Sequence, residues 1–339
     1  MKTPLVSIIV PFYNTGHSAQ ALINNLRNQS YENLQIIFVN DGSTDDTLKL
    51  LEEAKQQDHR IILINQKNSG SATARNSGLK KATGQYVMFF DSDDEVDPEI
   101  VEKMLGKIQE SSSDMVTCGF KYHRLKTNST TAVFINPVAR RHQKEALAPY
   151  IIRLLGNDGR LHSSVNKIFR IDIIKRHKLK FDPKLNFGED LIFVLNYLKY
   201  AQNIDFLYEP LYTYHYGTPT STVKDSSLKY KNWQQNWQFL TDYFQPKNPA
   251  EQDQLNWIRY RWGYSYCLAV YRSDQTKRQK LDLLHAVIKD KALPPVGKRK
   301  HIGKGKYLQE KLFRLARKTP STLYAFIASV AKIKQASDS

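Results

Sequence analysis

Acidic and amide side chains follow three apolar segments of the 339-residue sequence, and each of these segments is expected to be a strand. The three polar stretches are Pro11-Phe12-Tyr13-Asn14, Asn40-Asp41-Gly42-Ser43 and Asp91-Ser92-Asp93-Asp94. Carboxylates that gather in one place repel one another unless something cationic lies among them. A divalent cation with oxygen ligands suits such a place, and Mg²⁺ or Mn²⁺ holding a diphosphate would satisfy both charge and ligand geometry. The pattern therefore predicts a site for a metal-bound diphosphate.

Alternating strands and helices in the first third of the chain would position these side chains. We expect strands at residues 5–10, 34–39, 60–65 and 86–90, and helices at about 44–57, at 71–83 and from Asp97 onward. Repeated strand–helix units imply a parallel sheet with helices on both faces. Because ligands bind beyond the carboxyl ends of the strands in such sheets, the three polar stretches should meet at one edge.

Two common phosphate-binding devices are absent from the sequence, which narrows the kinds of nucleotide site that it could form. No G-x-G-x-x-G follows the first expected strand and no G-x-x-x-x-G-K-[ST] occurs, which argues against a nicotinamide dinucleotide fold and a P-loop. Each acidic stretch taken alone has a simpler explanation, because Asp and Ser also form turns and helix caps. The ordered combination at strand ends is the more specific signal.

These stretches, together with two that lie between them, resemble family 2 glycosyltransferases with the GT-A fold. The added stretches are Asn68-Ser69-Gly70 and Ala74-Arg75-Asn76-Ser77-Gly78. The resemblance covers about the first 110 residues closely and continues loosely through Asn166–Phe169, Phe187–Asp190 and Tyr212–His215. It implies an α/β fold in which a Rossmann-like, mostly parallel sheet is flanked by helices, with a helical C-terminal extension.

The resemblance assigns a donor site to the first half of this fold. Asp41 would hydrogen-bond the nucleobase, expected to be uracil. The backbone around Pro11 and Tyr13 would wall that base, and Asn14 belongs to the same site. Further donor-binding residues are Asn68, Gly70, Arg75, Asp91 and Ser92. Asp93 is expected to ligate Mn²⁺ or Mg²⁺, while Asp91 contacts the ribose or a metal-bound water.

Glu189 and Asp190 would supply the acid–base chemistry that the resemblance implies. Glycosyl transfer needs a leaving group stabilised as it departs with negative charge, and an acceptor hydroxyl that loses its proton to a carboxylate. By chemistry alone either residue could serve, but the family pattern favours Asp190 as the base and Glu189 in positioning the acceptor or its neighbours. A base opposite the leaving group gives inversion. An acidic pair favoured at a helix N-terminus is the alternative explanation.

The remaining two thirds of the chain are less regular in sequence. We expect strands at 115–120 and 131–134, helices at 145–155 and 190–200, and a helical, aromatic region from about residue 226. We therefore divide the chain into a nucleotide-sugar-binding half at 1–110, an acceptor-binding half at 111–225 and a basic helical region at 226–339. Lys167 could contact a phosphate or lie in solvent. His215 could line the acceptor site or be structural.

Composition excludes several classes of protein. The two cysteines, Cys118 and Cys267, rule out a disulfide framework and a thiolate zinc site, and they fit a reducing compartment. The N-terminus lacks the pattern of a secretory signal, and no run reaches the roughly 18 apolar residues of a membrane span. We expect a cytoplasmic protein, with peripheral attachment to the inner face of the cell membrane as a further hypothesis.

The formal net charge of +17 is unevenly distributed along the chain. Residues 1–110 contain 11 Lys+Arg and 15 Asp+Glu, whereas residues 111–339 contain 39 and 18. The segment 298–334 alone has 11 basic residues and one acidic residue. A basic amphipathic helix at 307–318 and the apolar stretch 323–330 suggest an anionic membrane surface as a partner. Packing of these segments on the protein's own core is the alternative, and no nucleic-acid-binding module is recognisable.

The leading functional expectation is an inverting, metal-dependent hexosyltransferase that moves one sugar from a nucleotide-diphospho-sugar, expected to be a UDP-sugar. Its acceptor would be a saccharide, a polyprenyl-diphosphate-linked sugar or a wall polymer, in the synthesis of cell-surface polysaccharide or cell wall. The Q-x-x-R-W motif of processive relatives is absent, which favours a single transfer. Two alternatives stay open: a nucleotidyltransferase, which also uses acidic strand ends and a metal, and a non-enzymatic polyanion-binding protein, which leaves the acidic set unexplained.

Overall fold

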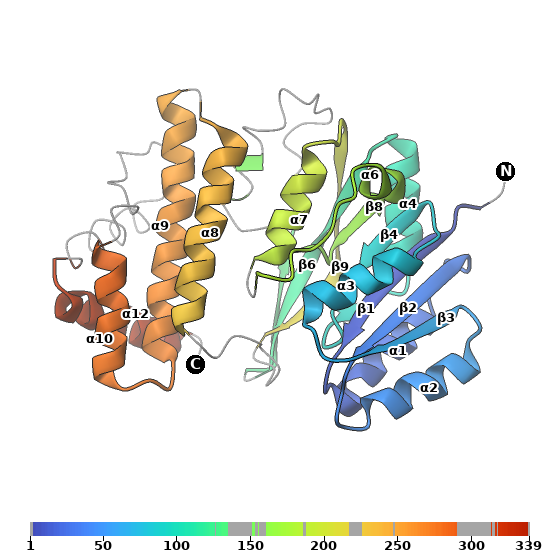
Figure 1. The fold of residues 1–339 in the computed structure, drawn as a ribbon, viewed down its shortest axis with the longest axis horizontal. Coiled ribbons are helices and arrows are strands. Elements are labelled where there is room, and N and C mark those ends of the chain that lie inside the picture. Colours follow the sequence, from blue (N-terminus) through green and yellow to red (C-terminus); the bar gives the residue numbers. More distant parts are fainter. Residues whose placement is uncertain are drawn as a thin grey trace. The chain divides into compact units, whose positions relative to one another are not determined.

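The structure is a computed structural model of the chain, shown in Figure 1. The residues that it describes are 3–125, 127–134, 151–152, 155, 161–185, 188–216, 226–246, 248–289, 313, 316 and 318–337. The chain divides into two compact units, one of Met1–Leu147 with Arg160–Ser221 and the other of Ala148–Gly159 with Thr222–Ser339. Each unit is considered by itself.

The first unit is built on a sheet that, in the described residues, has nine strands in the order β3-β2-β1-β4-β8-β6-β9-β5, with β7 beside β6. The strands are β1 (Val6–Phe12), β2 (Leu34–Asp41), β3 (Ile61–Gln66), β4 (Tyr86–Phe89), β5 (Glu95–Val96), β6 (Met115–Arg124), β7 (Ser129–Val133), β8 (Lys167–Arg170) and β9 (Ile204–Tyr216). β5, β7 and β8 run antiparallel to their neighbours, whereas the other strands point the same way.

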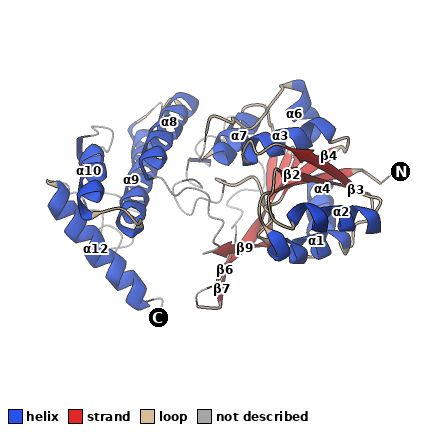
Figure 2. Cartoon of the chain, turned by 60° about the horizontal axis from the view of Figure 1, so that its bottom comes forward, coloured by secondary structure: helices blue, strands red, loops and turns tan. Residues whose placement is uncertain are grey.

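Helices cover both faces of this sheet, as Figure 2 shows. One face carries α1 (Gln20–Arg27), α2 (Thr47–Gln57) and α4 (Ile100–Glu110). The other carries α3 (Ser71–Lys81), α6 (Ile171–Arg176) and α7 (Glu189–Leu198), and a short 3-10 helix, η1 (Gly16–Ala19), precedes α1. This two-sided cover explains why β1 and β4 are apolar along their length, because strands of a parallel sheet are buried on both faces.

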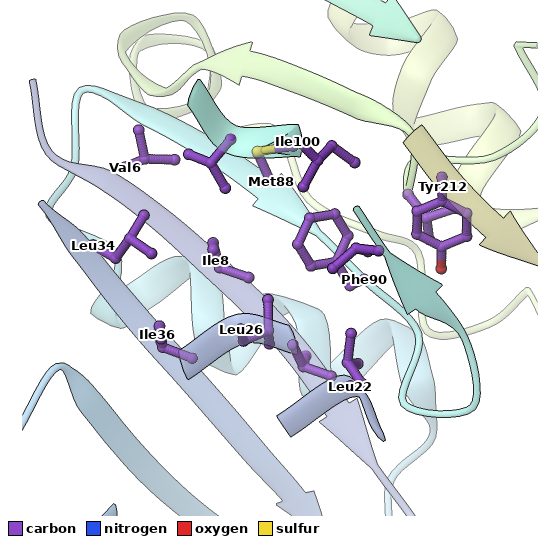
Figure 3. Close-up of a cluster of buried hydrophobic side chains, with 14 of the residues drawn as sticks. Val6, Ile8, Leu22, Leu26, Leu34, Ile36, Met88, Phe90, Ile100 and Tyr212 are labelled. Atoms are coloured by element: carbon purple, nitrogen blue, oxygen red, sulfur yellow. The ribbon is translucent and has the colours of Figure 1, made fainter. Parts of the chain in front are cut away.

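Alternate residues of each central strand point to opposite faces, so each strand contributes to two layers of core. In one layer Ile8 of β1 packs in a cluster with Leu26 of α1 and Ile100 of α4 (Figure 3). In the other layer Phe89 of β4 meets Phe193 of α7 edge to face, with ring centroids 5.5 Å apart. Burying one such apolar side chain contributes about 1.5–3 kcal/mol, so the two layers fix the strand ends firmly.

β8 enters the sheet between β4 and β6 with the opposite direction to both. In the register of β4 with β8, Val87 lies opposite Phe169 and Met88 lies opposite Ile168. An antiparallel strand begins where its neighbour ends. Lys167, the first residue of β8, therefore lies at the edge of the sheet where β4 ends and the stretch Asp91-Ser92-Asp93-Asp94 begins.

The second unit consists of helices in its described part. They are α8 (Ser226–Phe244), α9 (Pro249–Arg272), α10 (Lys277–Lys289) and α12 (Pro320–Ser337). Buried aromatic side chains, including Trp233 and Trp257, form a cluster with Leu323 and Ile327 of α12. The apolar stretch 323–330 therefore packs within its own unit. In the described residues, no helix combines the length and apolar character needed to cross a bilayer.

The expected α/β fold is confirmed, with a mostly parallel sheet, helices on both faces and a helical C-terminal region. The expected strands of the first third are present with small shifts at their ends. β9 was not expected, because Pro210 interrupts its pattern, and a register shift against Gly119 of β6 accommodates that proline. The expected helices at 145–155 and 307–318, and Phe187, lie largely or wholly outside the described residues.

Gly78 of α3 marks a close approach of that helix to β1. A Cβ at this position would overlap Ile9 Cγ2, so Gly78→Ala should lower the free energy of unfolding by about 1–3 kcal/mol through overpacking. Gly106→Ala on α4 is the matched control, because a Cβ there meets nothing within 4 Å and should add about 0.4–1 kcal/mol. Urea denaturation followed by circular dichroism measures both changes. Equal stability of Gly78→Ala and the wild type would contradict the close packing.

Candidate active site

Asn14 joins the loops that follow β1 and β2. Its backbone N–H donates to Ser43 Oγ at 3.1 Å, and its Oδ1 accepts from the Thr44 N–H at 2.8 Å. Its φ of 49° lies in the left-handed region, which Asn adopts more readily than most residues. Two of the three polar stretches singled out in the sequence are therefore fastened to each other.

Asp41, the last residue of β2, is 3% exposed and holds the next loop in place. Its Oδ1 accepts from Gln66 Nε2 at 2.7 Å and from the Ser69 N–H at 3.0 Å, and its Oδ2 accepts from the Gly70 N–H at 2.8 Å. A carboxylate offers about four acceptor positions. Asp41 therefore fixes the loop that contains Asn68 and Gly70 and keeps capacity for about one further donor.

Arg75 of α3 is the cation that the acidic stretches require. Its side chain is 5% exposed, and its guanidinium nitrogens lie 2.6 Å from Asp91 Oδ1, 3.5 Å from Glu189 Oε1 and 3.3 Å from Asp190 Oδ1. The guanidinium also lies over the ring of Phe181, 5.4 Å from its centroid. Asp91 follows β4, whereas Glu189 and Asp190 begin α7. One buried cation therefore joins two acidic motifs that are far apart in the sequence.

Glu189 and Asp190 occupy the first turn of α7, where the helix dipole favours carboxylates. Asp190 Oδ1 accepts from Ser164 Oγ at 3.1 Å, and the Ser164 N–H lies 3.4 Å from Asp190 Oδ2. Glu189 Oε1 accepts from Ser71 Oγ at 3.2 Å. Each of the two carboxylates is therefore held by a hydroxyl from another element as well as by Arg75.

Asp94 has surroundings different from those of its acidic neighbours. It is 2% exposed, and it accepts from Tyr212 OH at 2.5 Å and from the His215 N–H at 3.0 Å. The His215 ring lies against Asp93, with Nδ1 2.9 Å from the Asp93 carbonyl oxygen. Asp94 therefore ties β9 to the loop after β4. This contact supports the structural role that was one of two alternatives for His215.

Burial and mutual repulsion raise the carboxyl pKa values in this cluster. Burial, Asp190 and Asp93 raise the pKa of Asp91, although Arg75 opposes the rise. Burial and then Asp190 likewise raise the pKa of Glu189 against the effect of Arg75. Burial alone would lower the pKa of the Arg75 guanidinium, but the three carboxylates raise it above its ordinary value. Perturbed groups of this kind cluster at functional sites.

The donor atoms near Asp93 fit a cation that is shared with a ligand. The described residues contain no group of three or more His, Cys, Asp or Glu side chains that could hold a metal ion alone. Mg²⁺ is commonly bound through one or two carboxylates, with waters and substrate phosphates as its other ligands. Asp93, half-buried and next to Asp91, is an oxygen ligand of that kind. The residues therefore fit a metal that a diphosphate completes, and not a closed metal centre.

The other residues singled out in the sequence differ in their surroundings. Tyr13 is 45% exposed and Asn68 is exposed, Pro11 is half-buried, and Ser92 is buried. Lys167 is 0% exposed, so the solvated position considered for it is wrong. A surface position is the usual place for a lysine, and only the insertion of β8 into the sheet reverses that expectation here.

Sequence reasoning assigned no role to three residues that hold the acidic cluster, although two of them, Asp94 and Tyr212, lie in stretches that it quoted. Ser164 contacts Asp190, and Tyr212 and Asp94 contact each other. Asp94 has a signal in the sequence, because three carboxylates within four residues repel one another and are expected to need separate partners. Ser164 carries no local signal, since its role depends on a strand pairing that is distant in sequence.

Comparison with known proteins places these features in a family. The model described as "Glycosyl transferase family 2" matches residues 7–177, and Glu189 and Asp190 follow the matched segment. EpsH of Bacillus subtilis strain 168, a glycosyltransferase by name, is 33% identical over 226 residues, which are 66% of this chain and 63% of EpsH. The chain thus spans less than two thirds of the length of that relative.

Two solved structures share the fold. Staphylococcus aureus TarS 1–349 in complex with UDP-GlcNAc has a TM-score of 0.67 and 19% identity, covering 96% of this chain and 91% of that one. The mannosyltransferase PcManGT from Pyrobaculum calidifontis, with GDP-Man and Mn²⁺, has a TM-score of 0.54 and 15% identity, covering 98% and 87%. At these identities the likeness extends to the fold, and the expected GT-A-like architecture is confirmed.

Removing the Arg75 cation should destabilise the protein in a pH-dependent way. Arg75→Met leaves three carboxylates without their shared cation, and the free energy of unfolding should fall by about 3–5 kcal/mol near pH 8. The raised pKa values of Asp91 and Glu189 would rise further, so the folded state would bind more protons than the unfolded state above about pH 4. The deficit should therefore shrink as the pH falls toward about 5.

Arg176→Met is the matched control, because it removes an arginine of α6 whose side chain is 67% exposed. A surface pair of this kind contributes about 0–1 kcal/mol, so the control should change stability little at any pH. Denaturant unfolding across this pH range measures both variants. A deficit for Arg75→Met that does not vary with pH would show that carboxylate repulsion is not its cause.

Proposed function

The chain belongs to glycosyl transferase family 2, and on that premise we propose that it transfers one sugar from a nucleotide-diphospho-sugar to an acceptor hydroxyl. The observation that carries the proposal is the meeting of two acidic motifs at Arg75. It brings carboxylates suited to a metal-bound diphosphate close to carboxylates suited to deprotonating a hydroxyl. Family membership favours sugar transfer over the nucleotidyl transfer and polyanion binding that the sequence left open.

A UDP-sugar is the proposed donor, bound by the first 110 residues. The remaining lone pair of the Asp41 carboxylate would accept a hydrogen bond from an N–H of uracil. The backbone near Pro11 and Tyr13 would line the pocket for the base. Asn14 and the loop with Asn68 and Gly70 shape the same place. The fold shared with TarS, whose structure contains UDP-GlcNAc, supports a uridine nucleotide.

Mn²⁺ or Mg²⁺ is the proposed cofactor, held by Asp93 together with the donor diphosphate. When bound, such a cation stabilises the negative charge that develops on the departing diphosphate. The Mn²⁺ in the related fold of PcManGT supports this choice. Asp91 and Arg75 would lie beside the same charge, and their ion pair at 2.6 Å keeps the Asp91 carboxylate oriented before the donor arrives.

Asp190 is the proposed base of an inverting displacement. Its Oδ1 is engaged by Ser164 Oγ and Arg75, while its Oδ2 has the longer 3.4 Å contact, so Oδ2 has more capacity for an acceptor hydroxyl. The hydroxyl proton would pass to Asp190 as the new C–O bond forms and the bond to the diphosphate breaks on the opposite side. Glu189, held by Ser71, would position the acceptor or its neighbours.

Residues 111–225 are the proposed acceptor-binding half, and a saccharide, a polyprenyl-diphosphate-linked sugar or a wall polymer is the proposed acceptor. The basic region 226–339 would bring the enzyme to an anionic membrane surface, at the inner face of the cell membrane. The support is the 11 basic residues and one acidic residue of 298–334. Because Leu323 and Ile327 are buried in their own unit, charge and not apolar insertion would drive this attachment.

Asp190→Asn should abolish transfer and leave donor binding intact. The loss of the base should lower turnover by about 10²–10⁴-fold, while the dissociation constant for UDP with Mn²⁺ should stay within about twofold of the wild-type value. Release of UDP from the preferred donor and calorimetric binding of UDP measure the two effects. Asp172→Asn on α6, which removes a carboxylate that is 41% exposed, is the control. Normal turnover by Asp190→Asn would show that the base assignment is wrong.

Asp93→Asn should weaken nucleotide binding only in the presence of the metal. We expect the affinity for UDP to fall about tenfold or more with Mn²⁺, because a metal ligand is lost, and to be unchanged with EDTA. A thermal-shift screen of nucleotide-sugars with and without Mn²⁺ identifies the donor first. Asp97→Asn, which removes a carboxylate that accepts from the Glu99 N–H, is the control. An equal loss of affinity with EDTA would exclude a metal-dependent role.

A further inference from the structure

Lys167 is a buried cation that the proposed mechanism does not use. It is the first residue of β8 and is 0% exposed. Its Nζ donates to the Ser163 carbonyl oxygen at 2.6 Å and to Asn166 Oδ1 at 2.8 Å. Asn166 in turn donates from Nδ2 to the Cys118 carbonyl oxygen of β6 at 2.6 Å. The Lys167 ammonium is buried and hydrogen-bonded within the chain, so its contacts with the surrounding chain are the basis of the inference below.

The segment that Lys167 holds is the one that contacts the proposed base. Ser163 and Ser164 are adjacent, and Ser164, also 0% exposed, donates from Oγ to Asp190 Oδ1 at 3.1 Å. Lys167 thus fixes the carbonyl of the residue immediately before the Asp190 donor. The contacts run from β6 through Asn166 and Lys167 to the Ser163–Ser164 turn and then to α7.

A lysine at this position is costly for stability. Burying an ammonium costs several kcal/mol, and an apolar side chain of similar volume would fill the same space without that cost. Burial lowers the pKa of Lys167 to about 7, against the opposing effects of Cys118 and Asp190. The charged form has three N–H donors and the neutral amine has two, so either form can donate to the Ser163 carbonyl oxygen and to Asn166 Oδ1.

We propose that Lys167 is a positioning residue for Asp190, acting through the Ser163–Ser164 turn to set the direction in which the carboxylate faces the acceptor. The inference rests on the proposed function, in which Asp190 is the base. Lys167 itself touches neither donor nor acceptor. Its effect is on turnover, because a base displaced by about 1 Å can lose about 100-fold in rate while the binding of the donor is untouched.

Lys167→Met is the main variant, since it keeps the side chain as far as Cε and removes the Nζ that donates to Ser163 and Asn166. We expect the turnover number for UDP release to fall about 10–100-fold, with the KM of the donor and the affinity for UDP with Mn²⁺ within about twofold of wild type. The donor probe is whichever of UDP-GlcNAc, UDP-glucose and UDP-galactose the wild type hydrolyses fastest. Lys175→Met on α6, an exposed lysine, is the control and should behave as wild type.

Lys167→Gln keeps a hydrogen-bond donor and should lose less activity than Lys167→Met. A higher turnover for Lys167→Gln than for Lys167→Met distinguishes positioning from simple loss of packing. Glutamine fills an apolar space less well than methionine, so a packing role would give the opposite result. Thermal unfolding establishes whether each variant is folded. If Lys167→Met does not fold, the single variants Lys167→Gln and Ser164→Ala are compared with the wild type instead. Wild-type turnover by folded Lys167→Met, or a loss in Lys167→Gln as large as that in Lys167→Met, would overturn the proposal.

A double-mutant cycle tests whether Lys167 acts through Ser164. If it does, the double variant Ser164→Ala with Lys167→Met should be no more than about threefold slower than the slower single variant, because both changes remove the same support. Losses that multiply would mean independent effects and would overturn the proposal.

A crystal structure of Lys167→Met gives a readout that needs no activity. We expect Ser164 Oγ to lie more than 3.5 Å from Asp190 Oδ1, compared with 3.1 Å in the wild type, in an otherwise unchanged sheet. An unchanged distance would overturn the proposal. If the wild type releases no UDP from any donor, the proposed function fails, and this distance still decides whether Lys167 positions Asp190.

Discussion

The buried guanidinium of Arg75 is the interaction on which the rest of the site depends. Acidic residues of two motifs gather near the edge of the sheet, and such a concentration of negative charge is unfavourable without a compensating cation. Arg75 supplies that cation from the first half of the fold and reaches carboxylates of both acidic motifs. Its planar, permanently charged group can contact several carboxylates at once, which a lysine ammonium does less well. Contacts within the chain therefore hold the carboxylates of both motifs in place.

The carboxylates at this edge of the sheet fall into two groups, which differ in burial and in the number of hydrogen bonds that they accept from the chain. Asp41 and Asp94 are almost fully buried and accept several hydrogen bonds from the chain, so their first role is to hold loops and strands together. Asp91 and Asp190 keep more exposed side chains, at 29% and 18%. The reaction chemistry proposed above falls to the less buried carboxylates, because a carboxylate needs lone pairs that the chain does not already use to bind a metal or take a proton.

The first third of the fold and its half of the site could be predicted from the sequence, because each polar stretch directly follows an apolar strand. Parallel pairing of β1, β2 and β4 then forces those stretches together, whatever the later chain does. Lys167 and Ser164 could not be predicted in this way. Their roles come from the reversed strand β8, whose partners β4 and β6 are remote in sequence, and no local pattern records such a pairing. A lysine also resembles a surface residue in any argument from composition.

β8 is synthesised well after β4, with which it pairs, and this delay has a consequence for the nascent chain. β4 pairs with β1 on one side soon after it is made, but its other side waits for a strand about 80 residues further along. At a synthesis rate of about 5–20 residues per second, that edge stays open for about 4–16 s. An apolar, unpaired strand edge is a template for association with other chains. β4, the strand that Asp91 and Asp93 follow, is thus also the place where newly made molecules are exposed to aggregation until β8 is made and covers its edge.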